Sequence, residues 1–115
     1  MFGQLPILEI NENNGTIVKL AQSNTIARFL ARRFNLAGKT DIEQAKAEMI
    51  LDYFTDLHSL FQQAYYVDNE QVKLEKMKIF SQEQFPHHIS LLEKLLEQQN
   101  SQYLAGDELT GIKRL

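Results

Sequence analysis

A single predicted β-hairpin, followed only by sequence of helical character, is the feature that most constrains how this chain can fold. Residues 7–10 and 16–20 are short β-prone runs, and Asn14-Gly15 lies between them. Asn-Gly is the strongest short-range hairpin signal, because both residues accept positive φ. We therefore predict a hairpin over residues 5–20. Two strands alone are marginally stable in water, so this hairpin needs a larger sheet.

A first helix is expected directly after the hairpin. Its apolar residues recur on one face, at Ile26, Ala27, Leu30 and Phe34. Ser23 or Asn24 is a natural N-cap, and Gly38 is a plausible stop. A second helix is expected to begin with Thr40 or Asp41 as its cap. Its apolar residues keep a sustained helical period, at Ile42, Ala45, Met49, Tyr53, Leu57, Leu60, Phe61 and Ala64.

A third helical stretch is expected from about residue 70 to residue 98, after a connection at residues 66–69. Pro86 falls inside it. Proline removes one backbone hydrogen bond and clashes with the preceding turn, so we predict a kink or break near Phe85. The two resulting segments, at an angle to each other, are residues 70–85 and 87–98. A turn is expected at residues 100–102 and a tail after them.

Composition excludes several classes of function. The formal net charge is −3 and the twelve basic residues are scattered, which argues against nucleic acid or an anionic membrane as partner. The absence of cysteine excludes disulfides, thiolate metal sites and a cysteine nucleophile, and with them thioredoxin-type redox chemistry. No signal peptide and no apolar run of roughly 20 residues is seen, so a cytosolic location is expected. The three histidines have no metal-ligand spacing, and they are His58, His87 and His88.

Three stretches resemble the cytosolic glutathione transferases, in particular their sigma class with its prostaglandin D synthase-like members. They are residues 2–10 with 22–23 and 26–30, residues 36–40 at the family's link between domains, and residues 103–110. Their order and spacing match the family over nearly the whole chain. The hairpin loop is longer than in relatives by a few residues, and Lys113 stands where the family usually has a capping-box aspartate.

The resemblance implies an α+β, mainly α fold that is an internal fragment of a larger one. Residues 1–38 are expected to supply the last β-hairpin and third helix of a thioredoxin-like domain. Residues 39–115 are expected to supply the first two long helices of the all-helical C-terminal domain. The tyrosine that activates the glutathione thiol in this class is expected before Met1. No residue of this chain is therefore assigned a catalytic role.

The start of the first strand is a candidate peptide-binding segment. A proline there cannot donate to the ladder, and it holds the preceding residue extended, so Leu5 can offer its N–H and C=O to a peptide-like ligand. The resemblance implies a cis Leu5-Pro6 bond and contact with glutathione. The simpler alternative is a turn proline before a strand. The resemblance also places Gln4 beside the cysteinyl–glycine end of glutathione.

Gln22-Ser23 is a candidate anion-binding pair. A helix N-terminus presents free N–H groups and the positive end of the helix dipole, so it binds carboxylates. The resemblance implies that this pair holds the γ-glutamyl carboxylate of glutathione. A plain serine N-cap is the alternative.

Asp52 and Asp56 lie four residues apart on the second helix, a spacing that is slightly destabilising unless a cation is near. In the family, an aspartate matching Asp56 reaches the glutathione bound in the partner subunit, so a homodimer is implied. The alternative is a solvated acidic stripe. Tyr53 lies on the apolar stripe and is interpreted as packing.

The function implied by the resemblance is conjugation of reduced glutathione, as substrate, to a hydrophobic electrophile. Isomerisation of a prostaglandin-like endoperoxide, as in some sigma-class relatives, is the other reaction it implies. No metal, nucleic acid or membrane is expected to take part. Two alternatives stay open. The chain is either a non-catalytic module for glutathione binding or dimerisation, or an inactive fragment without a role of its own.

Overall fold

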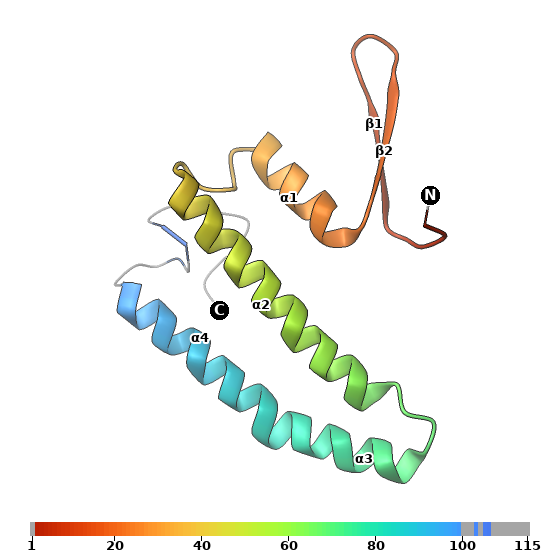
Figure 1. Cartoon of the computed structure of the whole chain (residues 1–115), viewed down its shortest axis with the longest axis vertical. Coiled ribbons are helices and arrows are strands. Elements are labelled where there is room, and N and C mark those ends of the chain that lie inside the picture. The colour runs from red at the N-terminus through yellow and green to blue at the C-terminus, as the bar shows by residue number, and fades with distance from the viewer. Residues whose placement is uncertain (1, 100–102, 104, 107–115) are drawn as a thin grey trace.

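The computed structural model describes residues 2–99, 103 and 105–106 of the chain. The expected order of hairpin, helix and two long helical stretches is confirmed, and so is the mainly helical α+β fold (Figure 1). The elements are β1 (Ile7–Asn11), β2 (Ile17–Ala21), α1 (Ser23–Arg33), α2 (Asp41–Tyr65), α3 (Glu70–Ile79), the π-helical turn η1 (Phe80–Gln84) and α4 (Phe85–Gln99). The turn expected at residues 100–102 and the tail after residue 106 lie outside the described residues.

The hairpin is antiparallel, with a register that runs from Ile7 opposite Ala21 to Asn11 opposite Ile17. The predicted Asn-Gly turn is present, and Gly15 adopts a φ of 83°. Side chains on both faces of the ribbon are exposed or only half-buried. Figure 1 shows the hairpin projecting beyond the helices, so little of the described chain covers it.

The first helix ends earlier than the sequence indicates, and Gly38 is not its stop. Asn35 adopts a φ of 57° directly after the helix. The Asn35 N–H donates to the carbonyl of Arg32 at 3.3 Å, and the Leu36 N–H donates to that of Ala31 at 2.7 Å. This pair of bonds is a Schellman motif, in which asparagine takes the left-handed position that glycine usually occupies. The prediction of Gly38 as the stop was therefore wrong.

Gly38 instead meets the start of α2. Thr40 is the N-cap, as predicted, and it forms a capping box with Glu43. The φ of Gly38 is 105°, and a Cβ at this position would lie 2.8 Å from Glu43 Cβ. Gly106 approaches the same side chain, because its Cβ would lie 3.2 Å from Glu43 Cδ. Glu43 thus joins the linker, the first turn of α2 and the segment at residues 105–106.

Two apolar clusters hold α2 against the second helical arm. Near α4, buried Ile50 and Leu92 pack with the half-buried side chains of Tyr53, Phe54, Ile89, Leu95 and Leu96. Near η1, buried Leu57, Ala64 and Phe80 pack with Leu60, Phe61 and Met77. At the first cluster, the Tyr53 hydroxyl is hydrogen-bonded to Nδ1 of His88. The interpretation of Tyr53 as packing is confirmed, with a polar contact that the sequence did not indicate.

The expected disturbance before Pro86 is a π-helical turn rather than a break. The Phe85 N–H donates to the carbonyl of Phe80, five residues back. Pro86 has no N–H to donate, and the wider turn lets the backbone continue past it. The helical arm is therefore continuous from Glu70 to Gln99, and it bends where α3 gives way to α4 (Figure 1).

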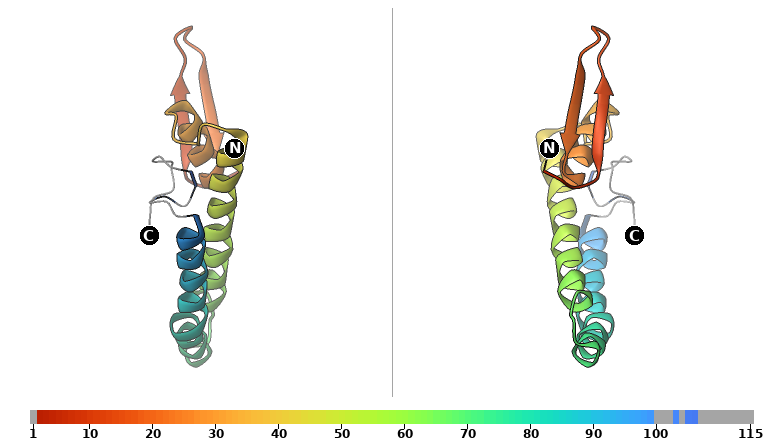
Figure 2. Two further views of the ribbon diagram at one scale, coloured as in Figure 1. Left: turned by 90° about the vertical axis from the view of Figure 1, so that its left-hand side faces the viewer. Right: turned by 90° about the vertical axis from the view of Figure 1, so that its right-hand side faces the viewer.

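The described chain is thin and open. Its extents are 56 × 42 × 16 Å, and Figure 2 shows the helices side by side in one layer. The radius of gyration is 17.7 Å, whereas a compact chain of this length has about 13 Å. Many large apolar side chains are exposed in consequence, among them Phe2, Leu5, Ile17, Phe34, Ile42 and Leu74.

Gly38→Ala is expected to destabilise the protein by about 1–3 kcal/mol, because the new methyl group meets Glu43 and the backbone is held at positive φ. The matched control is Gly15→Ala. Gly15 also has a positive φ, but nothing lies within 4 Å of its would-be Cβ. Urea unfolding of the variants should show the larger loss for Gly38→Ala. Equal losses would mean that the contact with Glu43 contributes nothing.

Tyr53→Phe is expected to cost about 1 kcal/mol at neutral pH through loss of its hydrogen bond to His88. Burial raises the pKa of the Tyr53 hydroxyl above its ordinary value. The unfolded chain therefore loses this proton first as pH rises, and the stability contributed by the neutral hydroxyl falls above about pH 10. The stability gap between wild type and Tyr53→Phe should narrow over that range.

Thermal unfolding at a series of pH values measures this gap. Tyr66→Phe makes the same chemical change on a residue that is 75% exposed, and it should alter stability little at neutral pH. A gap that widens with alkaline pH would contradict the prediction.

Candidate functional site

The candidate site is a hollow of about 140 Å³ at the base of the hairpin, where the chain passes from β2 into α1. The segment before β1 forms one wall, and the residues that join β2 to α1 form the other. Figure 1 shows these two segments next to each other at the base of the hairpin. The residues that line the hollow are Phe2, Gln4, Leu5, Pro6, Ala21, Gln22 and Ser23. The structure therefore brings together every candidate binding residue except Asp56.

The first wall presents unpaired backbone. The Leu5-Pro6 peptide bond is cis, and the ladder to β2 starts with Ile7 opposite Ala21. Leu5 thus lies just beyond the paired strand, and its side chain is 87% exposed. Within the described part of the chain, no hydrogen bond engages its N–H or C=O. Both groups are available to an extended, peptide-like ligand, as one more strand would use them.

The second wall is the uncapped N-terminus of α1. Gln22, not Ser23 or Asn24, is the N-cap residue, and its carbonyl accepts from the Ile26 N–H at 2.9 Å. That part of the cap prediction was wrong, because Ser23 is already the first helical residue. No side chain caps the helix, and its first turn has no acidic residue. The leading N–H groups therefore face the hollow without an anionic partner.

Gln22 has an unusual backbone conformation, with φ 74° and ψ 114°. A residue with a Cβ rarely adopts positive φ, and such conformations concentrate at functional sites. Here the conformation turns the chain sharply from β2 into α1. Gln22 and Ser23 thereby line the same hollow.

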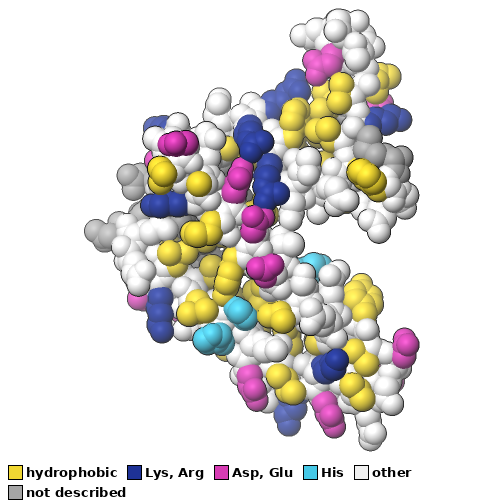
Figure 3. All heavy atoms as spheres, viewed as in Figure 1, with side chains coloured by type: hydrophobic (Ala, Val, Ile, Leu, Met, Phe, Trp, Pro, Cys, Tyr) yellow, Lys and Arg dark blue, Asp and Glu magenta, His cyan; other side chains and the backbone are white. Residues whose placement is uncertain are grey.

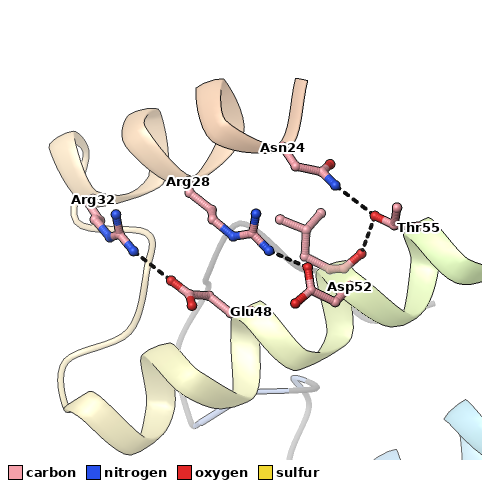
Figure 4. Close-up of polar contacts among 7 residues, drawn as sticks. Asn24, Arg28, Arg32, Glu48, Asp52 and Thr55 are labelled. Atoms are coloured by element: carbon pink, nitrogen blue, oxygen red, sulfur yellow. Dashed lines mark hydrogen bonds and ion pairs between the residues drawn. The ribbon is translucent and has the colours of Figure 1, made fainter. Parts of the chain in front are cut away.

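A polar ladder fixes α1 against α2 (Figure 4). Asn24 Nδ2 donates to Thr55 Oγ1 at 2.8 Å, and Thr55 in turn donates to the Leu51 carbonyl at 3.0 Å. The next two rungs are the ion pairs Arg28–Asp52 and Arg32–Glu48. The rungs are spaced by about one helical turn on each helix. Because Asn24 follows Ser23, the first rung holds the rim of the hollow to α2.

This ladder was not predicted from the sequence, although a signal was present. Arg28 and Arg32 are four residues apart, and so are their partners Glu48 and Asp52. Matched spacing of opposite charges on two helices indicates pairing, but not which helices meet. Figure 3 shows the basic and acidic side chains side by side across the middle of the molecule. Arg28 is a cation beside Asp52, and such a cation offsets the repulsion between like charges at this spacing.

Asp56 lies on the exposed surface of α2, one turn beyond Asp52. It does not line the hollow, and within the described residues it makes no ion pair. Its assignment to a site shared with a second subunit stays a prediction. No group of three or more metal-ligating side chains occurs in the part of the chain that the structure describes. Among the same residues, no helix is long and apolar enough to span a membrane.

Comparison with known proteins finds relatives of one kind. The profile described as "Glutathione S-transferase, C-terminal domain" matches residues 55–111. Glutathione S-transferase 1 of Ascaris suum is 38% identical over 112 residues, which cover 95% of this chain and 52% of that protein. Probable glutathione S-transferase 5 of Caenorhabditis elegans is 38% identical, with coverages of 96% and 53%.

Solved structures agree with the sequence relatives. The Fasciola hepatica sigma class GST has a TM-score of 0.78 at 28% identity, and the match covers 95% of this chain and 51% of that one. Prostaglandin synthase D of Nilaparvata lugens has a TM-score of 0.82 at 25% identity, with coverages of 96% and 52%. The chain is therefore similar over nearly its whole length to proteins named as glutathione S-transferases. It spans about half the length of the curated relatives it matches.

The Arg28–Asp52 rung is expected to contribute about 0.5–1 kcal/mol of coupling, at the upper end for a surface pair because the Arg28 side chain is only 27% exposed. Urea unfolding of Arg28→Met, Asp52→Asn and the double variant measures the coupling, which should fall at high salt. Arg33 provides the control, since it lies over the Phe29 ring at 5.7 Å. The losses of unfolding free energy caused by Arg33→Met and Asp52→Asn should add in their double variant. A coupling between these two residues as large as that between Arg28 and Asp52 would contradict the assignment of the ion pair.

Proposed function

We propose that the hollow at the base of the hairpin binds glutathione, and that the protein is a glutathione transferase of the sigma-like kind. The observation that carries this proposal is the joint lining of one hollow by a free backbone edge and an uncapped helix N-terminus. Glutathione is a short peptide with free carboxylates, so it needs both kinds of contact. Similarity to proteins named as glutathione S-transferases supports the choice of ligand.

The helix terminus would take the γ-glutamyl carboxylate. The N–H groups at the start of α1 and the Ser23 hydroxyl can donate to this carboxylate. The Gln22 side-chain amide can also donate to the γ-glutamyl residue. Charge-assisted hydrogen bonds of this kind contribute about 1.5–3 kcal/mol each. Leu5 would pair its N–H and C=O with the cysteinyl residue, while Gln4 contacts the cysteinyl–glycine end.

The reaction would be attack of the glutathione thiolate on a hydrophobic electrophile, or isomerisation of a prostaglandin-like endoperoxide. The match with a prostaglandin synthase fold supports the second. The hydroxyl donor that stabilises the thiolate is assigned to a tyrosine outside this sequence. We place residues 1–38 in the thioredoxin-like part and residues 39–115 in the helical part. We propose a homodimer in which Asp56 contacts the glutathione bound in the partner subunit. We also propose that the protein is located in the cytoplasm.

A glutathione-binding module without turnover is the second candidate. Among the residues that line the hollow, the one side-chain hydroxyl belongs to Ser23, which is already assigned to the carboxylate. The described residues thus supply contacts for holding the peptide, and no group in a position to activate its thiol. Binding and turnover must therefore be measured separately.

Thermal unfolding of the chain with and without millimolar glutathione tests the binding. Glutathione at 100 times its dissociation constant should stabilise the protein by about 2.7 kcal/mol, which raises the melting temperature by several degrees. Ser23→Ala should weaken binding by about tenfold or more, because it removes a donor to a charged group. Conjugation of an aryl halide then distinguishes a transferase from a module.

Ser59→Ala is the matched control, since the Ser59 hydroxyl donates to the Thr55 carbonyl within α2, away from the hollow. It should leave the response to glutathione unchanged. Cysteinylglycine, which lacks the γ-glutamyl carboxylate, should stabilise the chain much less. Equal stabilisation by both peptides would reject the assignment of the carboxylate to α1. An unfolding transition that is indifferent to glutathione would reject the site.

A further inference from the structure

The tip of the hairpin carries an Asn-Gly pair that the proposed function does not use. Asn14 and Gly15 are exposed, in the turn that joins β1 to β2, at the end of the hairpin farthest from α1 (Figure 1). Nothing lies within 4 Å of the position that a Gly15 Cβ would occupy. Neither a side chain on Gly15 nor any residue beyond its two chain neighbours therefore crowds this side of the Gly15 backbone.

The turn also holds the Asn14 side chain in place through a hydrogen bond. The Thr16 N–H donates to Asn14 Oδ1 at 2.9 Å, which folds the side-chain amide back over the peptide that follows. A bond between the side-chain carbonyl carbon of Asn14 and the Gly15 nitrogen closes a five-membered ring. The same Thr16 N–H can stabilise the negative charge that develops on Oδ1 during nucleophilic attack.

We propose that Asn14-Gly15 is a site of spontaneous deamidation and isoaspartate formation. The Gly15 amide nitrogen gives up its proton and bonds to Asn14 Cγ. The Cγ–Nδ2 bond breaks, and the side-chain nitrogen leaves as ammonia. The cyclic imide then takes up one water molecule. Opening at the Asn14 main-chain carbonyl gives isoaspartate, and opening at Cγ gives aspartate.

The turn also contains a restraint on the reaction. The Gly15 N–H donates to the Glu12 carbonyl at 2.9 Å, and this bond must open before the nitrogen can react. The folded chain should therefore react more slowly than the unfolded one. Every other asparagine precedes a residue with a side chain, which hinders the ring closure. These are Asn11, Asn13, Asn24, Asn35, Asn69 and Asn100.

The product differs from the original turn in two ways. A carboxylate replaces a neutral amide, which adds one negative charge to the formal net charge of −3. Isoaspartate also adds one carbon to the main chain between β1 and β2. The partner that this chemistry would attract is a methyltransferase that recognises the free α-carboxylate of an isoaspartyl residue. The hollow at Leu5 and Ser23 lies at the opposite end of the hairpin, so binding there should be unaffected.

Ageing of the folded protein at physiological temperature, at neutral and at mildly alkaline pH, tests the proposal. Mass spectrometry of the tryptic peptide that ends at Lys19 resolves the neighbouring asparagines. Asn14 should lose its amide about tenfold faster than Asn13, a difference of about 1.4 kcal/mol in activation free energy. The rate should rise with pH, and an isoaspartyl methyltransferase should label the aged protein.

Gly15→Ala should slow the loss by about tenfold, because the new methyl group crowds the attacking nitrogen. Gly3→Ala is the matched control. Gly3 also has a positive φ and nothing within 4 Å of its would-be Cβ, but it does not follow an asparagine. In Gly3→Ala, Asn14 should lose its amide at the same rate as in the wild type. Equal rates at Asn13 and Asn14, or aspartate formed without isoaspartate, would overturn the proposal.

Discussion

The polar ladder between α1 and α2 is the contact on which the placement of the candidate site depends. Apolar clusters hold α2 to the second helical arm, whereas the ladder and the linker join α1 to α2. Exposed ion pairs each contribute little, so orientation must come from their number and spacing. Asn24 matters most for the site, because it fixes the helix start that lines the hollow.

The site itself follows from how the backbone is used at the junction of hairpin and helix. Leu5 lies beyond the first pair of the ladder, and the N-terminus of α1 has no side-chain cap. Both arrangements leave hydrogen-bonding groups without partners in the described chain, which costs stability unless a ligand or water satisfies them. A peptide with a terminal carboxylate satisfies both kinds of group at once. This is the physical basis for the proposed glutathione site.

Much of the fold was predictable because its signals are local. The Asn-Gly turn, the cap at Thr40 and the apolar period of α2 each depend on neighbouring residues, and each is confirmed. The predictions that failed also have local reasons. Asn35 took the left-handed position expected of Gly38, and Gln22 took the cap expected of Ser23 or Asn24. In both cases a residue other than glycine adopts a positive φ, which glycine tolerates better.

The sequence by itself determined the elements, their order, the absence of cysteine side chains and the family resemblance, since these depend on residue type and spacing. Only the tertiary structure decided which groups meet. It paired Arg28 with Asp52, joined Tyr53 to His88 and brought Gln4, Leu5, Gln22 and Ser23 around one hollow. Spacing along a chain fixes the face of an element on which a residue lies. It does not fix which face of another element packs against it, because that depends on the packing of the whole.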